Sequence, residues 1–224
     1  SLASAGYNAA LSGVAAQTTM GAEAVFGALL YNSGAEDAAL FAEGSEEREI
    51  LFETLTRGET QGLTYKSAPK DVLGRFQHYE ASHDPLRGVL LEVIGERYRS
   101  ELPNDDAARL ILVDYAGAVF PALLADNLGE YLYNALINCF GGLVRANSIM
   151  RRAGVLWSAL VYALCAGFLL LSRGRISLDP ERRFMQLILM SALANAAFCA
   201  FGVFALSRYV YYNFPCMYLA LALY

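Results

Sequence analysis

The sequence predicts an all-α fold, in which an extracytoplasmic helical domain (residues 1–152) precedes the transmembrane helices of a polytopic membrane protein (residues 153–224). Three observations support this prediction: two long uncharged runs, repeated helix start and stop signals, and no alternating strand pattern. The 224 residues are 56% hydrophobic and 17% charged, more apolar than an ordinary soluble domain. Because the chain begins without Met and ends inside an apolar run, we interpret it as a fragment.

Charge divides the chain into two parts. Residues 1–144 hold 20 acidic and 9 basic residues, whereas residues 145–224 hold 2 acidic and 8 basic ones, within a formal net charge of -5. Such a balance disfavours a nucleic-acid-binding protein, which carries a basic surface. We therefore expect no nucleic-acid partner and two different surroundings for the two parts.

Helix signals begin near the N-terminus. Residues 7–31 are rich in Ala and are followed by Asn32, Ser33 and Gly34, which predicts a buried or amphipathic helix that stops there. Ser45 precedes several acidic residues and a partial apolar stripe, so it predicts the N-cap of a surface helix that ends near Gly58.

Two proline-containing segments follow. Asp84 with Pro85 predicts the start of a helix over residues 86–98, separate from residues 71–79. Residues 107–125 are apolar but contain Asp114 and Pro121, and two interpretations stay open: an interfacial or domain-core helix kinked near Pro121, or a re-entrant segment. Asp126 is predicted to cap the next helix, in which Tyr131 and Tyr133 suit the headgroup region.

Two uncharged runs predict membrane spans, at about residues 153–172 and 184–207. About 20 residues at a rise of about 1.5 Å each match a hydrocarbon core of about 30 Å. A third apolar run starts at about residue 216 and breaks off at the end of the chain, so we expect a truncated third span there.

The loop between the first two spans predicts the topology. It carries four arginines, Arg173, Arg175, Arg182 and Arg183, and short arginine-rich loops stay in the cytoplasm. Residues 1–152 are then extracytoplasmic, although Arg145, Arg151 and Arg152 at their end do not fit this rule. Asp179 and Pro180 predict that the second span helix begins before the hydrocarbon. We expect an integral protein of a bacterial cytoplasmic membrane, with membrane lipid as a partner.

The two histidines, His78 and His83, are the residues around which a metal or proton-transfer site could form, with Glu80 and Asp84 beside them. Their spacing does not place them on one helix face, and we favour surface-loop histidines over a metal site. The four cysteines are far apart and form no zinc or disulfide pattern. We therefore predict no metal and no cofactor.

Asp114 is the carboxylate most worth testing, because it lies alone in an apolar run. It is either capped by a polar neighbour in the domain core or exposed at the lipid interface as a substrate-binding carboxylate. An ionised carboxylate in apolar surroundings is costly unless it is paired.

The last residues carry the most specific pattern. Arg208 and Tyr209 follow the second span, Tyr211, Tyr212 and Phe214 form an aromatic cluster at headgroup depth, and Pro215 opens the next apolar run. This is either an ordinary aromatic belt with a snorkelling arginine or a site in which a guanidinium holds the phosphate of a lipid-linked substrate.

Residues 208–224 resemble the C-terminal part of membrane glycosyltransferases that use polyprenyl-phosphate sugars, the mannosyltransferase and aminoarabinose-transferase class. The resemblance implies a polyprenyl-phosphate sugar as donor, with Arg208, Tyr209 and Tyr212 in substrate binding. The catalytic acid of that family lies in an outer loop with no matching position here, so the catalytic residues stay unknown. The large acidic helical domain departs from the family pattern.

The leading hypothesis is therefore a fragment of such a glycosyltransferase, acting on the outer face of the membrane. The alternative is a non-enzymatic polytopic membrane protein whose outer helical domain binds a partner or scaffolds an envelope assembly. A transporter ranks third.

Overall fold

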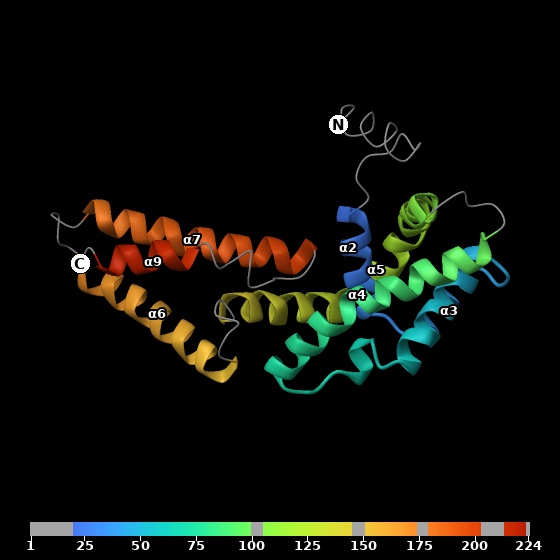
Figure 1. Cartoon of the computed structure of the whole chain (residues 1–224), viewed down its shortest axis with the longest axis horizontal. Coiled ribbons are helices and arrows are strands. Elements are labelled where there is room, and N and C mark those ends of the chain that lie inside the picture. Colours follow the sequence, from blue (N-terminus) through green and yellow to red (C-terminus); the bar gives the residue numbers. More distant parts are fainter. Residues whose placement is uncertain (1–19, 100–104, 145–150, 174–178, 203–212, 223–224) are drawn as a thin grey trace, which may run out of the picture. The chain divides into compact units, whose positions relative to one another are not determined.

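The computed structural model describes residues 20–99, 105–144, 151–173, 179–202 and 213–222. All regular elements in these ranges are helices, which confirms the predicted all-α class (Figure 1). The chain divides into two compact units, Ser1–Asn134 and Ala135–Tyr224, and helix α5 (Asp105–Val144) contributes to both. The predicted boundary after residue 152 concerns the membrane surface and stays a prediction.

The first unit contains α2 (Met20–Tyr31), η1 (Ala35–Leu40), α3 (Glu46–Thr60), η2 (Tyr65–Ser67), α4 (Val72–Arg97) and most of α5. Helix α2 stops where the sequence predicts, because the side chains of Asn32 and Ser33 donate to carbonyls of its last turn, at 2.7 and 2.9 Å. The part of the predicted helix before residue 20 lies outside the described residues.

Ser45 is the N-cap of α3, as predicted, and its Oγ accepts a hydrogen bond from the backbone N of Arg48 at 3.3 Å. The helix ends at Thr60, two residues beyond the predicted stop near Gly58. A Cβ at Gly58 would lie 2.5 Å from Leu86 Cδ1. This glycine therefore permits close packing of α3 against α4 instead of ending the helix.

The predicted helix start at Asp84 and Pro85 is also wrong, because α4 runs through both residues. Its N-cap is Asp71, whose carboxylate accepts from Gly74 N at 2.8 Å. Buried residues continue at helical spacing on both sides of the proline, including Tyr79, Ser82, His83, Leu86, Val89 and Leu90. Pro85 and Ala81, four residues earlier, are both exposed, so solvent can hydrate the carbonyl that the proline leaves without a donor.

Helix α5 corrects one further prediction, because Asp126 lies inside it without starting a new helix. The helix also continues through Pro121, where the predicted kink stays a prediction. Pro121 is exposed, as is Gly117 four residues before it, which is the arrangement found at Pro85 in α4. On the opposite side, Leu112, Tyr115, Val119 and Leu123 are buried at helical spacing. Packing along this face keeps the helix continuous where the local signals predict a break.

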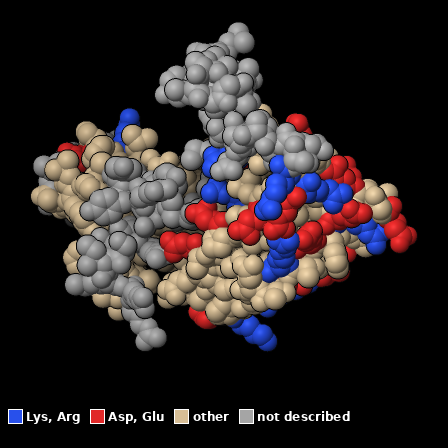
Figure 2. Space-filling view, turned by 45° about the vertical axis from the view of Figure 1, so that its right-hand side comes forward, with Lys and Arg blue, Asp and Glu red and all other residues tan. Residues whose placement is uncertain are grey.

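The core of the first unit consists of large apolar side chains from α2, α3 and α4 that are almost fully buried. They include Phe26, Leu29, Leu30, Tyr31, Ile50, Leu51, Leu55, Phe76, Tyr79, Leu86 and Leu90. Acidic and basic side chains mix on the surface of this unit (Figure 2). Ion pairs join α3 to α4 there, since Arg57 contacts Glu96 at 2.6 Å and Arg97 contacts Glu49 at 2.8 Å.

The second unit packs α6 (Arg151–Leu171), α7 (Asp179–Gly202) and α9 (Asn213–Ala222). Helices α6 and α9 run in the same direction and α7 runs in the opposite one (Figure 1). Their core contains Val161, Cys165, Met185, Ile188, Ala192, Phe214, Met217 and Ala220. Phe214 is thus buried, whereas the sequence placed it in an aromatic cluster at headgroup depth.

Three described helices are long and apolar enough to cross a membrane: Ala108–Val144, Ala153–Leu171 and Pro180–Phe201. The last two correspond to the predicted spans, and α7 begins at Asp179, as the Asp179–Pro180 pair predicts. The first lies in α5, of which the sequence analysis interpreted residues 107–125 as an interfacial, domain-core or re-entrant segment. The described part of α9 has 10 residues, so the truncated third span at about residue 216 stays a prediction.

Candidate functional site

The substrate-binding residues predicted from the sequence are only partly described. Arg208, Tyr209 and Tyr212 lie outside the described residues, in the connection between α7 and α9. Asp114 is exposed on α5 and makes no hydrogen bond or ion pair with the residues that the structure describes. This removes one of its two interpretations, a carboxylate capped in the domain core.

The most connected polar group of the first unit is a cluster that we call the polar centre, formed by Asn32, Arg75, Glu130 and Asn134. Arg75 on α4 donates from Nε to Asn134 Oδ1 at 2.7 Å and from Nη2 to Glu130 Oε2 at 2.8 Å. Asn134 Nδ2 then donates to Asn32 Oδ1, just after α2. The polar centre therefore ties α2, α4 and α5 together.

Aromatic rings flank the guanidinium of the polar centre. The Cζ of Arg75 lies 4.8 Å from the ring centroid of Tyr133 and 5.9 Å from that of Tyr65. These contacts add cation–π attraction and fix the plane of the guanidinium. The Arg75 side chain is 15% exposed and that of Glu130 is 44% exposed, so this ion pair lies at the edge of the core.

His78 lies one turn from the polar centre in α4, and both ring nitrogens have partners. Nε2 lies 2.9 Å from the carbonyl oxygen of Gly62, which can only accept, so Nε2 carries a hydrogen. In the neutral ring Nδ1 accepts from the hydroxyl of Tyr31, also at 2.9 Å. Burial raises the pKa of Tyr31, which keeps this hydroxyl a donor.

His83 is fully buried between α2 and α4. Its Nε2 donates to the carbonyl oxygen of Ala24 at 3.0 Å, and Nδ1 lies 3.4 Å from Asp84 Oδ1. A Cβ at Gly27 would lie 3.2 Å from Nε2, so this glycine allows the ring to approach α2. Burial lowers the pKa of His83 below its ordinary value.

The interpretation of both histidines as surface-loop residues is therefore wrong. They lie on α4 and link it to α2 and to the loop at Gly62. Within the described residues, no three His, Cys, Asp or Glu side chains gather in a way that could hold a metal ion. The predicted lack of a metal stays untested.

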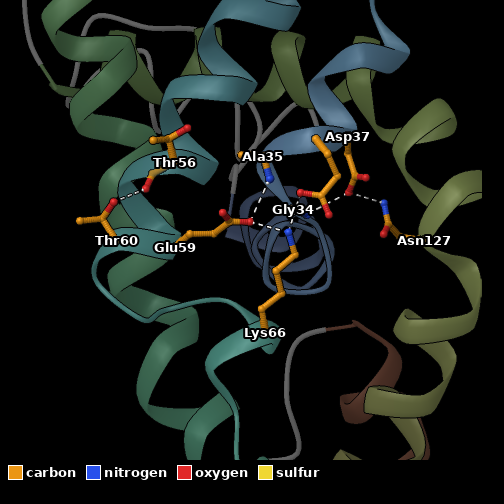
Figure 3. A network of polar contacts seen from close by, with 9 residues as sticks. Gly34, Ala35, Asp37, Thr56, Glu59, Thr60, Lys66 and Asn127 are labelled. Atoms are coloured by element: carbon orange, nitrogen blue, oxygen red, sulfur yellow. Dashed lines mark hydrogen bonds and ion pairs between the residues drawn. The ribbon is translucent and has the colours of Figure 1, made fainter.

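A second polar network fixes the turn after α2 (Figure 3). Asp37 accepts from the backbone N of Gly34 at 2.9 Å and from Asn127 Nδ2 at 2.8 Å. Lys66 Nζ donates to Glu36 at 2.5 Å and to Glu59 at 2.8 Å. The hydrogen bond from Lys66 lowers the pKa of Glu36. These contacts join η1, α3, η2 and α5.

The sequence analysis identified none of the residues in these two networks as important. Asn32 and Asn134 are 102 positions apart and Arg75 and Glu130 are 55 apart, so no local pattern connects them. The only local signal was Asn32 within the predicted helix stop. The hydrogen bonds and ion pairs of these two networks join helices to one another.

Comparison of the chain with protein-family models, with curated proteins and with solved structures returns no match.

Proposed function

We propose that this chain belongs to an integral membrane protein in which α6 and α7 cross the bilayer and the acidic first unit is a partner-binding or scaffolding domain outside it. The observation that carries the proposal is that α6 and α7 expose many large apolar side chains. They include Leu156, Leu160, Leu164, Leu170, Leu171, Leu187, Met190, Leu193 and Phe198. A soluble protein rarely exposes so continuous an apolar surface, whereas lipid solvates it.

The first half of α5 has the opposite pattern, although its hydropathy is also high. Its large apolar side chains are buried or half-buried in the first unit, and its exposed positions hold small or charged residues. These exposed residues are Arg109, Asp114, Gly117, Ala118, Pro121, Ala122 and Ala125. We therefore assign this half to the core of the outer domain, in agreement with the domain-core interpretation, and not to a span.

The contacts of the first unit support a binding or scaffolding role. The polar centre and the network around Asp37 use their polar groups to fix helices, and ion pairs cross between α3 and α4. A rigid, charged domain attached to a membrane anchor presents a fixed surface to a partner. The arginine-rich loop between α6 and α7 supports placing this domain on the extracytoplasmic side.

Cysteine labelling in intact cells tests the topology. With the four native cysteines replaced, Glu43→Cys, in the exposed loop before α3, is expected to react with an impermeant maleimide. Ser177→Cys, between α6 and α7, is expected to react only after the membrane is permeabilised. Labelling of Ser177→Cys but not of Glu43→Cys in intact cells would contradict the proposed orientation.

The glycosyltransferase hypothesis is the second candidate, supported by the sequence of residues 208–224. If Arg208 holds a donor phosphate, Arg208→Lys keeps the charge but loses the two-pronged donor geometry. Sugar transfer by the full-length protein should then fall by about one to two powers of ten, since such a contact contributes about 1.5 to 3 kcal/mol. Full transfer activity in the lysine variant would contradict a phosphate-binding role for Arg208, and absence of sugar transfer by the unchanged full-length protein would favour the scaffold over the enzyme.

A further inference from the structure

On the exposed surface of the second unit, a hydrogen bond joins aromatic side chains of two described helices. Trp157, the only tryptophan of the sequence, donates its indole N–H from α6 to the hydroxyl of Tyr218 on α9 at 2.7 Å. The ring centroids are 6.4 Å apart. Trp157 is 48% exposed and Tyr218 is 36% exposed, among exposed leucines such as Leu156, Leu160 and Leu219.

We propose that the Trp157–Tyr218 pair lies at the boundary between hydrocarbon and headgroups, where the Tyr218 hydroxyl donates its hydrogen to an ester or phosphate oxygen of a phospholipid. This inference rests on the proposed function, since it requires α6 to cross a bilayer. Beyond the proposed function, it states how deep the helices of the second unit lie in the membrane and which side chain makes a polar contact with lipid.

The hydrogen-bond inventory of the pair supports this depth. The indole of Trp157 has one N–H, and Tyr218 takes it. The hydroxyl of Tyr218 still has its own hydrogen, which finds no acceptor among the residues that the structure describes. A donor left without an acceptor in hydrocarbon is costly, whereas ester and phosphate oxygens are abundant at the boundary. Trp and Tyr are enriched at this level for that reason.

The lengths of α6 and α9 give the same depth for the two residues of the pair. Helices α6 and α9 run in the same direction, so both begin at one end of the bundle (Figure 1). At a rise of about 1.5 Å per residue, Trp157 lies about 9 Å after the start of α6 at Arg151, and Tyr218 about 8 Å after the start of α9 at Asn213. These lengths match a headgroup layer of about 5 to 8 Å per leaflet.

The position of the other hydrocarbon boundary, at the end of α6, agrees with this depth. From Trp157 to the exposed Arg173, just after α6 ends, the same rise gives about 24 Å. A guanidinium that snorkels towards the headgroups extends this by several ångströms and brings it close to the hydrocarbon thickness of about 30 Å. One pair at the start of α6 and one arginine at its end therefore bracket the hydrocarbon core.

The single tryptophan allows a direct test in the full chain, reconstituted into phosphatidylcholine vesicles. We expect Trp157 fluorescence to be quenched most strongly by lipids brominated near the glycerol end of the acyl chain. Strongest quenching by lipids brominated near the terminal methyl would place the pair deep in the membrane and overturn the inference, while the proposed membrane insertion would stand.

A relocated tryptophan is the matched control. In the double variant Trp157→Phe with Leu164→Trp, the reporter lies on the same exposed surface of α6, about 10 Å further along the helix. We expect its strongest quenching from bromines deeper in the chain. Quenching of neither reporter by any brominated lipid would show that α6 lies outside the bilayer, and would overturn the proposed function and this inference together.

The hydrogen bond is tested by Tyr218→Phe, which keeps the ring and removes the acceptor. The indole N–H then turns to water or lipid, so the emission of Trp157 should shift to longer wavelength. Tyr162→Phe is the control, because the buried hydroxyl of Tyr162 has no hydrogen-bond partner among the described residues and its ring contact is with Phe214. An unchanged spectrum in Tyr218→Phe, or an equal shift in Tyr162→Phe, would contradict the proposed pair.

Discussion

Arg75 shows how one side chain joins distant parts of the first unit. Its guanidinium donates to Asn134 and Glu130 in two directions while tyrosine rings hold its plane. A point charge on a flexible stem cannot reproduce this arrangement. Because Glu130 is 44% exposed, the ion pair itself contributes modestly, and the directed hydrogen bond to the buried Asn134 is the larger contribution.

We therefore expect Arg75→Lys to weaken the packing of α4 on α5 although the charge is kept. The free energy of local opening should fall by about 1.5 kcal/mol, as for the loss of a charge-assisted hydrogen bond. Native-state hydrogen exchange of α4 amides, in the full chain in detergent, measures this change. Arg48→Lys is the control, because the Arg48 side chain makes no hydrogen bond or ion pair with a described residue, and it should change the opening by less than about 0.5 kcal/mol. Equal effects of the two variants would show that the geometry of Arg75 does not matter.

His83 predicts a pH dependence with a definite sign. Its pKa in the folded protein lies below the ordinary value of 6.5 because burial disfavours the charged ring. As the pH falls below about 6.5, the unfolded chain binds a proton that the folded protein does not, so stability falls. Asp84 and Arg87 are the charged groups beside the ring.

The opening free energy of α2 and α4 should accordingly decrease between about pH 6.5 and the lower folded pKa of His83. His83→Gln keeps an N–H that can reach the carbonyl of Ala24 but removes the titration, so its opening should depend less on pH. Hydrogen exchange corrected for intrinsic rates provides the measurement. An unchanged pH slope in the glutamine variant would assign the dependence to another group.

At the scale of elements, α4 shows that packing can override a local helix-start signal. Asp84 with Pro85 has the sequence of a helix start, yet the buried face that includes Tyr79, His83 and Leu86 runs through it. Capping is worth about 1 kcal/mol, whereas burying several large side chains is worth more. The longer apolar face therefore prevails, and the cap is Asp71.

Two alanine substitutions test whether Asp71 or Asp84 caps the helix. Asp71→Ala removes the carboxylate that accepts from Gly74 N, and should reduce the stability of α4 by about 1 kcal/mol. Asp84→Ala removes the contacts of an exposed carboxylate with Arg87 at 3.3 Å and with His83 Nδ1 at 3.4 Å, and should change stability by less than about 0.5 kcal/mol. Circular dichroism during thermal unfolding of the full chain compares the two. A larger effect of Asp84→Ala would restore the predicted start at residue 86.

The elements that could be predicted were those with local causes. Ser45, the stop after Tyr31 and the helices of the two uncharged runs follow from capping and composition. The continuity of α4 and α5 could not be predicted, because it depends on which side chains are buried by distant parts of the chain. The polar centre could not be predicted either, since its members are brought together only by the packing of α2, α4 and α5.

At the scale of the whole molecule, hydropathy alone does not tell which helices cross the membrane. Three described helices are apolar and long enough, but the side chains they expose differ. A helix in a domain core points its large apolar residues inward, whereas a lipid-facing helix points them outward. The first half of helix α5 follows the first pattern at Leu112, Val119 and Leu123, and α6 follows the second at Leu156, Leu160 and Leu164.

This difference predicts the outcome of cysteine scanning in the full chain in membranes. Ala118→Cys and Ala122→Cys in α5 and Leu160→Cys and Leu164→Cys in α6 all lie at exposed positions, so protein packing shields none of them. With the native cysteines replaced, a charged, water-soluble maleimide should modify the α5 pair rapidly and the α6 pair hardly at all, because lipid keeps the reagent and the thiolate apart from α6. Detergent solubilisation, which admits the reagent, serves as the control for α6. Protection of Ala118→Cys and Ala122→Cys in membranes, relieved by detergent, would show that the first half of α5 is embedded in lipid and would contradict its assignment to the core of the outer domain.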